Sequence, residues 1–133
     1  MLPDDASFKV LLFEGFYLEW QKERSRFSGR TISTIYFGGG TPFLFGPKRI
    51  GQILDWIHRD VVFSNVNAEI TLEANPEHTT ISLMREFATC GINRVSFGVQ
   101  SFSEPLLHTL GRGHSPDRAY KAIDETVEAG ISN

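Results

Sequence analysis

Glycines and polar residues with complementary binding chemistry recur along this chain, each time just after an apolar segment. Glu73 and Gln100 close two such segments, and Arg112 follows in a glycine-flanked loop. A third apolar segment ends in glycines followed by a hydroxyl residue: Gly38, Gly39, Gly40 and Thr41. Glycine has no Cβ and accepts positive φ, so a ligand can come close to the backbone there.

These groups suit a zwitterionic amino acid. The Glu73 carboxylate accepts hydrogen bonds from an ammonium or hydroxyl group, while the Gln100 amide both donates and accepts. The planar guanidinium of Arg112 suits a carboxylate. We therefore expect the glycine backbone and Glu73 to bind the amine of such a ligand, and Arg112 to bind its carboxylate.

Other interpretations of the same residues remain open. The glycines could form only a tight turn, and Glu73, just before Asn75-Pro76, could be a solvated strand end or a helix cap. Arg112 could be a surface charge, which is the usual position of arginine. No histidine pair has metal-ligand spacing, and Cys90 is expected to be a small buried side chain. We predict no catalytic residue and no metal ligand.

The elements that must position these groups alternate along the chain. Strands are predicted over 31–37, 67–74 and 94–100, and helices over 7–25, 47–59, from 80 to Gly91 and from 115 to 130. The order αβαβαβα predicts an α/β fold with a parallel sheet. Ligands bind such folds at the carboxyl ends of the strands, which is where the polar groups lie.

Strand alternation also predicts a polar and an apolar sheet face. Glu69, Thr71 and Glu73 share one face of the second strand. Arg94 shares the polar face of the third strand, so we expect it to pair with Glu69 inside a barrel lumen, where breaking a buried pair costs roughly 3 to 5 kcal/mol.

Composition sets further bounds. The formal net charge of −3 favours neither nucleic acid nor an anionic membrane as a partner. No apolar stretch reaches the ~18 residues of a membrane span, and the first residues lack a secretory signal, so we expect a cytoplasmic protein. The single cysteine excludes an intramolecular disulfide and a multi-cysteine metal site.

The sequence resembles the oxygen-independent coproporphyrinogen III oxidase group of radical S-adenosylmethionine (radical SAM) proteins, and is most similar to its heme-chaperone branch. Four motifs carry the resemblance: Tyr36-Phe37-Gly38-Gly39-Gly40-Thr41-Pro42, Thr71-Leu72-Glu73-Ala74-Asn75-Pro76, Asn93-Arg94-Val95-Ser96-Phe97-Gly98-Val99-Gln100-Ser101-Phe102 and Leu110-Gly111-Arg112-Gly113-His114. The resemblance implies a partial (β/α)6 TIM-like barrel and a link to porphyrin and heme metabolism.

The resemblance also implies roles for the motif residues. Gly38, Gly39, Gly40 and Thr41 would meet the methionyl amine of S-adenosylmethionine, and Glu73 would lie in the same site. Gln100 would lie near its ribose and methionyl part, and Arg112 would reach its carboxylate. Heme or porphyrin would be a partner of the full-length parent.

One departure from the family qualifies these expectations. The family binds a [4Fe-4S] cluster through a CxxxCxxC-type loop that is missing here, and a lone Cys90 cannot replace several thiolates. We therefore expect residues 1–133 to be a fragment of the radical SAM core domain, without a cluster, binding S-adenosylmethionine weakly and inactive alone. The alternative is a non-catalytic binding or interaction module. A missing first strand would leave an open edge, so we also expect self-association.

Overall fold

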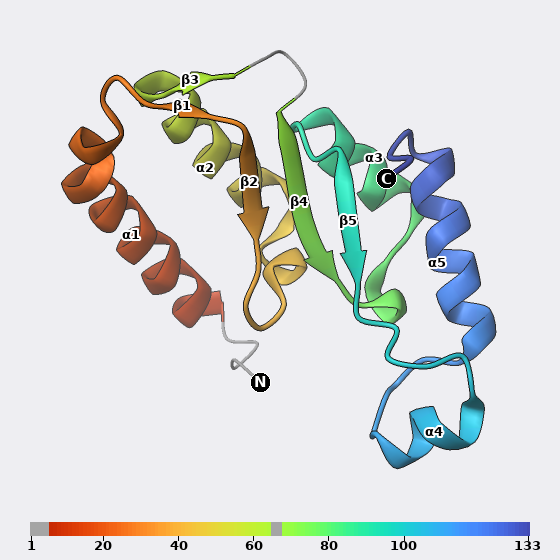
Figure 1. Ribbon diagram of the computed structural model, residues 1–133. Helices are drawn as coiled ribbons and strands as arrows, with labels where there is room; N and C mark the ends of the chain where they lie inside the picture. Colours follow the sequence, from red (N-terminus) through yellow and green to blue (C-terminus); the bar gives the residue numbers. More distant parts are fainter. Residues whose placement is uncertain (1–5, 65–67) are drawn as a thin grey trace.

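Helices and parallel strands alternate in the computed structural model, which describes residues 6–64 and 68–133 (Figure 1). The α-helices are α1 (Ala6–Glu23), α2 (Gly46–Asp60), α3 (Ile81–Thr89), α4 (Glu104–Thr109) and α5 (Pro116–Glu128). The strands are β1 (Thr31–Ile32), β2 (Thr34–Phe37), β3 (Val62–Phe63), β4 (Glu69–Ala74) and β5 (Arg94–Phe97). Short 3-10 turns follow as η1 (Arg24–Phe27), η2 (Pro42–Phe45) and η3 (Pro76–His78).

The main sheet has the order β2-β4-β5, with every pair parallel. This confirms the predicted α/β class. The strand predicted over 31–37 is wrong in one respect, because it divides at Ser33: β1 pairs with β3, and β2 pairs with β4. The division follows from a change of partner, since Ser64 donates to the Ile32 carbonyl and Glu69 to the Ser33 carbonyl. The predicted strand start at Asn67 lies outside the described residues.

Helices cover one face of the sheet. In Figure 1, α2 and α3 lie behind the strands, α5 lies beyond β5, and α1 stands off beyond the edge of β2. The buried core forms at the covered face, where Ile70, Leu72 and Ala74 alternate along β4 as expected. Buried side chains from the surrounding segments complete this core: Phe43, Ile50, Leu54, Met84, Phe87, Ile92 and Ile131.

Local signals in the sequence define the helix ends. The Thr80 hydroxyl accepts from the Leu83 N–H at the start of α3, and Ser115 caps α5 through the Arg118 N–H. Gly91 and Gly130 follow the two helices with positive φ, as predicted. The short helix α4 had no counterpart in the prediction. Among the described residues, no helix is long and apolar enough to span a membrane.

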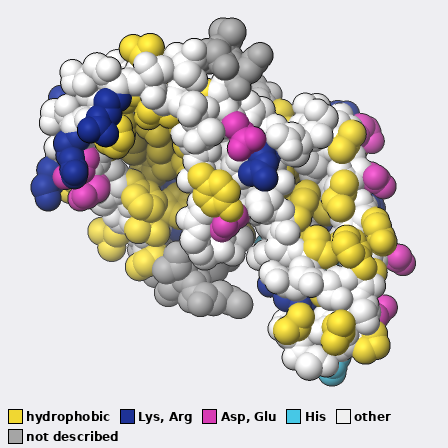
Figure 2. All heavy atoms as spheres, viewed as in Figure 1, with side chains coloured by type: hydrophobic (Ala, Val, Ile, Leu, Met, Phe, Trp, Pro, Cys, Tyr) yellow, Lys and Arg dark blue, Asp and Glu magenta, His cyan; other side chains and the backbone are white. Residues whose placement is uncertain are grey.

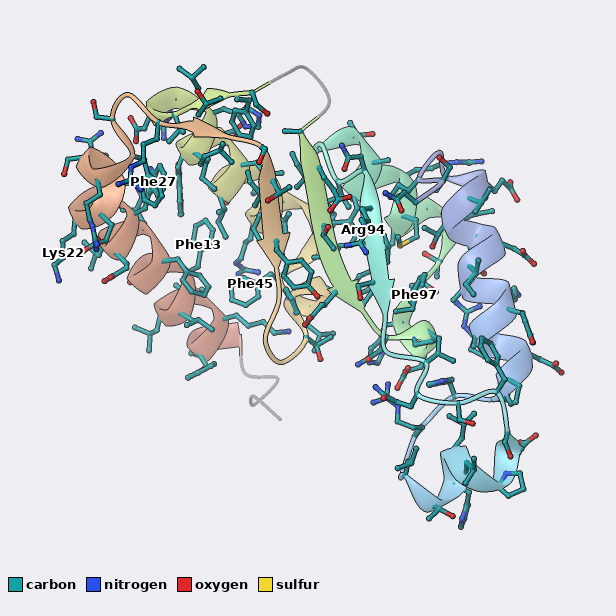
Figure 3. The ribbon with its side chains drawn as sticks, viewed as in Figure 1. Phe13, Lys22, Phe27, Phe45, Arg94 and Phe97 are labelled. Carbon is teal, nitrogen blue, oxygen red and sulfur yellow. The ribbon has the colours of Figure 1, made fainter. Side chains whose placement is uncertain are left out.

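The uncovered face of the sheet carries the polar residues. Arg94 Nη1 lies 3.7 Å from Glu69 Oε1, so the predicted pair forms. Its predicted burial is wrong, because the two side chains are 39% and 43% exposed. Thr71 lies beneath them, nearly inaccessible, and accepts from Arg94. Figure 3 shows Arg94 on this open side of β5.

Candidate functional site

A cavity of about 610 Å³ opens at the carboxyl ends of β4 and β5. Its wall includes five of the residues singled out from sequence: Gly40, Thr41, Glu73, Gln100 and Arg112. Helix α1 closes another side with Phe8, Lys9 and Leu12. The structure therefore gathers into one cavity groups that are far apart along the chain.

Gly38 and Gly39 lie just outside this cavity and line a neighbouring one. They still shape the site, because the Gly39 N–H donates to Glu73 Oε2 at 3.0 Å. Gly39 and Gly40 have φ of 88° and 67°, which favours glycine at both positions. A Cβ on Gly38 would lie 2.5 Å from the ring of Tyr36 and 3.2 Å from Glu73 Oε1, so this position needs glycine for close approach.

Glu73 is fixed by two donors. The Tyr36 hydroxyl donates to Oε1 at 2.6 Å, and the Gly39 N–H holds Oε2. The bond to this carboxylate is the main reason that the pKa of Tyr36 is raised. Glu73 is thus neither a free strand end nor a helix cap. Each of its oxygens can accept a further hydrogen bond from a ligand amine.

Gln100 does not lie in a strand, as the sequence predicted, but in the turn after β5. Strand β5 ends at Phe97, so the predicted strand to Gln100 is three residues too long. The backbone turns instead, since Val99 donates to the Phe97 carbonyl and Ser101 to the Val99 carbonyl. Gln100 has φ of 67° and is the only non-glycine residue with positive φ in the described ranges. Such strain is concentrated at functional sites, and here it lies on the cavity wall.

Arg112 reaches the site from the loop after α4. Its Nη2 donates to Asn75 Oδ1 at 3.0 Å and to the Gly98 carbonyl at 2.8 Å. Nε is buried without a hydrogen-bond partner, and Nη1 has none among the residues described. The guanidinium is thus held in place while Nη1 keeps its hydrogens for an acidic group.

Cys90 is remote from this cavity. Its thiol, at the end of α3, donates to the Phe87 carbonyl at 3.2 Å and lines a separate cavity. The predicted full burial of Cys90 is wrong, because its side chain is only partly buried. Even this partial burial raises the pKa of the thiol. Because the sequence has no other cysteine, the residues present do not fit a [4Fe-4S] cluster. Within residues 6–64 and 68–133, no cluster of acidic, histidine or cysteine side chains could hold a metal ion.

Sequence reasoning missed four residues near the cavity: Tyr36, Asn75, Glu77 and His114. Tyr36 had a signal in the sequence, because strand alternation puts it on one face with Thr34 in the predicted strand 31–37. Asn75 directly follows the predicted strand 67–74, and this position at a strand end was its signal. The contacts of Glu77 and His114 depend on loops that fold against each other, and no local pattern predicts them.

A second cavity, of about 530 Å³, lies between α1 and β2. Phe16, Trp20, Tyr36 and Trp56 are among its aromatic lining residues. Figure 2 shows the hydrophobic hollow, and Figure 3 shows Phe13, Phe27 and Phe45 directed into the space between helix and sheet. Helix α1 is attached here mainly through rings, with Phe13 and Tyr17 each 4.9 Å from Trp56 between centroids.

A parallel α/β fold with a polar cavity at its strand ends defines the class of this protein. The chain belongs to the Radical SAM superfamily, whose family model matches residues 17–133.

Among particular proteins, the chain is similar to the heme chaperone HemW of Mycobacterium tuberculosis H37Rv, with 37% identity over 86% of this chain and 29% of the relative. It is 42% identical to HemW of Escherichia coli K12 over 77% of this chain and 27% of the relative. The chain thus spans less than a third of the length of these relatives.

A solved structure supports the fold. The match, described as "Coproporphyrinogen III oxidase (HemN) from Escherichia coli is a Radical SAM enzyme", has a TM-score of 0.74. It covers 90% of this chain and 28% of that chain at 22% identity. The expected radical SAM architecture is therefore confirmed.

Proposed function

We propose that this chain forms an S-adenosylmethionine-binding part of a radical SAM protein related to heme chaperones and coproporphyrinogen oxidases. The observation that carries the proposal is the single cavity shared by Glu73, Gln100 and Arg112 at the strand ends. Superfamily membership makes S-adenosylmethionine the ligand to test first.

The cavity residues match the polar groups of this ligand. The Glu73 carboxylate is oriented by the Tyr36 hydroxyl and the Gly39 N–H, and it accepts a hydrogen bond from the methionyl ammonium. Gly40 allows the ligand to come close to the backbone. Arg112 offers charge-assisted hydrogen bonds to the carboxylate. Gln100 offers its amide to the ribose and methionyl part. In the superfamily, bound S-adenosylmethionine supplies radical chemistry.

We infer that the chain alone binds S-adenosylmethionine without cleaving it. The residues present do not fit the iron-sulfur cluster, so the ligand is held by protein groups only. Affinity is then expected in the millimolar range, roughly −4 kcal/mol. A binding or interaction module without catalysis is the competing function, and it predicts no specific binding of S-adenosylmethionine.

Titration with S-adenosylmethionine, followed by amide NMR shifts, tests the proposal. Wild type should show saturable shifts at Gly40 and Thr41, and Glu73→Ala should reduce the affinity severalfold. Glu69→Ala is the matched control, because it removes a carboxylate from the same strand outside the cavity. Equal affinities of wild type and Glu73→Ala, or no shifts at Gly40 and Thr41, would contradict a site here.

The relatives' names point to heme as a partner of the longer proteins, and we propose the same context for this chain. Hemin titration followed by Soret absorption tests whether this part contributes to heme binding. A saturable shift at one equivalent would support a heme site within these residues. Only non-saturating changes would place any heme site elsewhere.

A further inference from the structure

Three buried polar atoms without hydrogen bonds gather beside the cavity: Glu77 Oε2, Arg112 Nε and His114 Nδ1. They are the only such side-chain atoms in the described part of the chain. Native proteins contain few atoms of this kind, and each needs an explanation. Their grouping beside Arg112 indicates that Glu77 and His114 belong to the same structural unit as the binding site.

His114 connects two chain segments. Its side chain is fully buried, with Nδ1 3.3 Å from Glu77 Oε2 and Nε2 3.2 Å from the Val99 carbonyl oxygen. Both neighbouring oxygens are hydrogen-bond acceptors. The contact between Nδ1 and Glu77 Oε2 is within ion-pair distance but misses hydrogen-bond geometry.

Arg112 connects the same segments, through contacts that lie one or two residues from those of His114. Its Nη2 donates to Asn75 and to the Gly98 carbonyl, while His114 contacts Glu77 and Val99. The two side chains are therefore adjacent cross-links between the turn after β4, the turn after β5 and the loop after α4. The residue between them, Gly113, lies next to Glu77, because a Cβ on Gly113 would be in van der Waals contact with Oε1 at 3.7 Å.

These cross-links hold two groups of the cavity wall. Val99 precedes Gln100, whose positive φ persists only where its surroundings enforce it. The His114 ring meets the Val99 carbonyl directly before this residue. Arg112, two residues before His114, has a long side chain that would lose rotamer entropy on ligand binding unless it is already ordered.

We propose that Glu77 and His114 form a positioning pair that holds Arg112 and the Gln100 backbone in their ligand-binding geometry. This inference rests on the proposed function and assigns neither residue a contact with the ligand. Its largest effect is expected at the carboxylate end of the ligand, because Arg112 offers the charge-assisted hydrogen bonds to that carboxylate.

Two ligands separate positioning from general stability: S-adenosylmethionine and its decarboxylated analogue, which lacks the group that Arg112 recognises. In His114→Phe and Glu77→Gln, affinity for S-adenosylmethionine should fall about tenfold, while affinity for the analogue, which keeps the part of the ligand that Gln100 meets, should fall much less. His78→Phe is the matched control, because His78 is exposed on the same turn. Equal loss for both ligands, or no loss for either, would overturn the positioning role.

A second measurement does not depend on the ligand. The Arg112 Nε–H is buried, so its NMR signal should exchange slowly with water in the wild type and faster in both variants. If wild type binds neither ligand, the proposed function fails, and this signal alone decides the positioning role. Unchanged exchange in both folded variants would overturn it.

Discussion

The Tyr36 hydroxyl lies 2.6 Å from Oε1 of Glu73, across neighbouring parallel strands. This bond joins the open face of the sheet to the cavity, because Glu73 lines the cavity. The other oxygen of Glu73 accepts a hydrogen bond from the Gly39 N–H. A tyrosine on the strand surface therefore orients the carboxylate assigned to the ligand amine.

Replacing Glu73 by Gln should lower the pKa of Tyr36 toward its ordinary value. The neutral phenol donates to the carboxylate, so the raised pKa means that the bond is present below the ordinary tyrosine range near pH ~10 and is lost as pH rises through the raised value. The ultraviolet absorbance of phenolate measures this, with Tyr17 and Tyr120 as internal references. An identical Tyr36 titration in both proteins would contradict the bond.

Gly39→Ala should destabilise the fold through its backbone. A Cβ at Gly39 would meet nothing within 4 Å, but φ is 88°, and this conformation costs a non-glycine residue about 1 to 2 kcal/mol. Gly15→Ala is the control, since that position is also open and lies inside α1. There alanine should stabilise by up to about 1 kcal/mol. Urea unfolding of both variants checks the opposite signs.

Two carboxylate-to-amide substitutions should lower the free energy of unfolding by different amounts. Glu69→Gln removes a half-exposed partner of Arg94 and should cost less than about 1 kcal/mol. Glu125→Gln should cost about 2 kcal/mol, because Glu125 is 15% exposed and lies 2.7 Å from Arg118. Thermal unfolding of both proteins makes the comparison. Equal losses would show that exposure does not determine these energies.

Self-association is predicted from the outer face of α1. Leu11 and Leu18 are 66% and 68% exposed and lie seven residues apart, on the same side of the helix. Changing both to Glu should shift the light-scattering mass toward the monomer. Stability should change by less than about 0.5 kcal/mol per site, as at other surface positions. A wild type that is already monomeric at tens of micromolar would contradict this prediction.

The fold was predictable where local chemistry and tertiary contacts agree. Alternation along β4 correctly placed Ile70 and Leu72 in the core, and the helix starts predicted at Thr80 and Ser115 coincide with the caps found there. The division of 31–37 was not predictable, because the break at Ser33 arises from a change of pairing partner rather than from a local breaker.

The residues of the site were predictable, but the hydrogen bonds that hold their side chains were not. The predicted strands placed Glu73 and Gln100 at strand ends and Arg112 in a later loop, and the structure brings the three to one cavity. The tyrosine that holds Glu73 comes from a neighbouring strand, and the partners of Arg112 come from two turns. Such contacts depend on sheet register and loop packing, which single-residue properties do not encode.

The aromatic attachment of α1 has an optical consequence. Both tryptophans of the sequence lie at this boundary: Trp20 donates to Asp60 at 2.9 Å, and Trp56 packs against the rings of α1. Intrinsic fluorescence therefore reports the docking of one helix, whereas far-ultraviolet circular dichroism reports the whole chain. If α1 detaches before the sheet unfolds, the emission spectrum shifts first, and non-coincident transitions would then measure a local event rather than global stability.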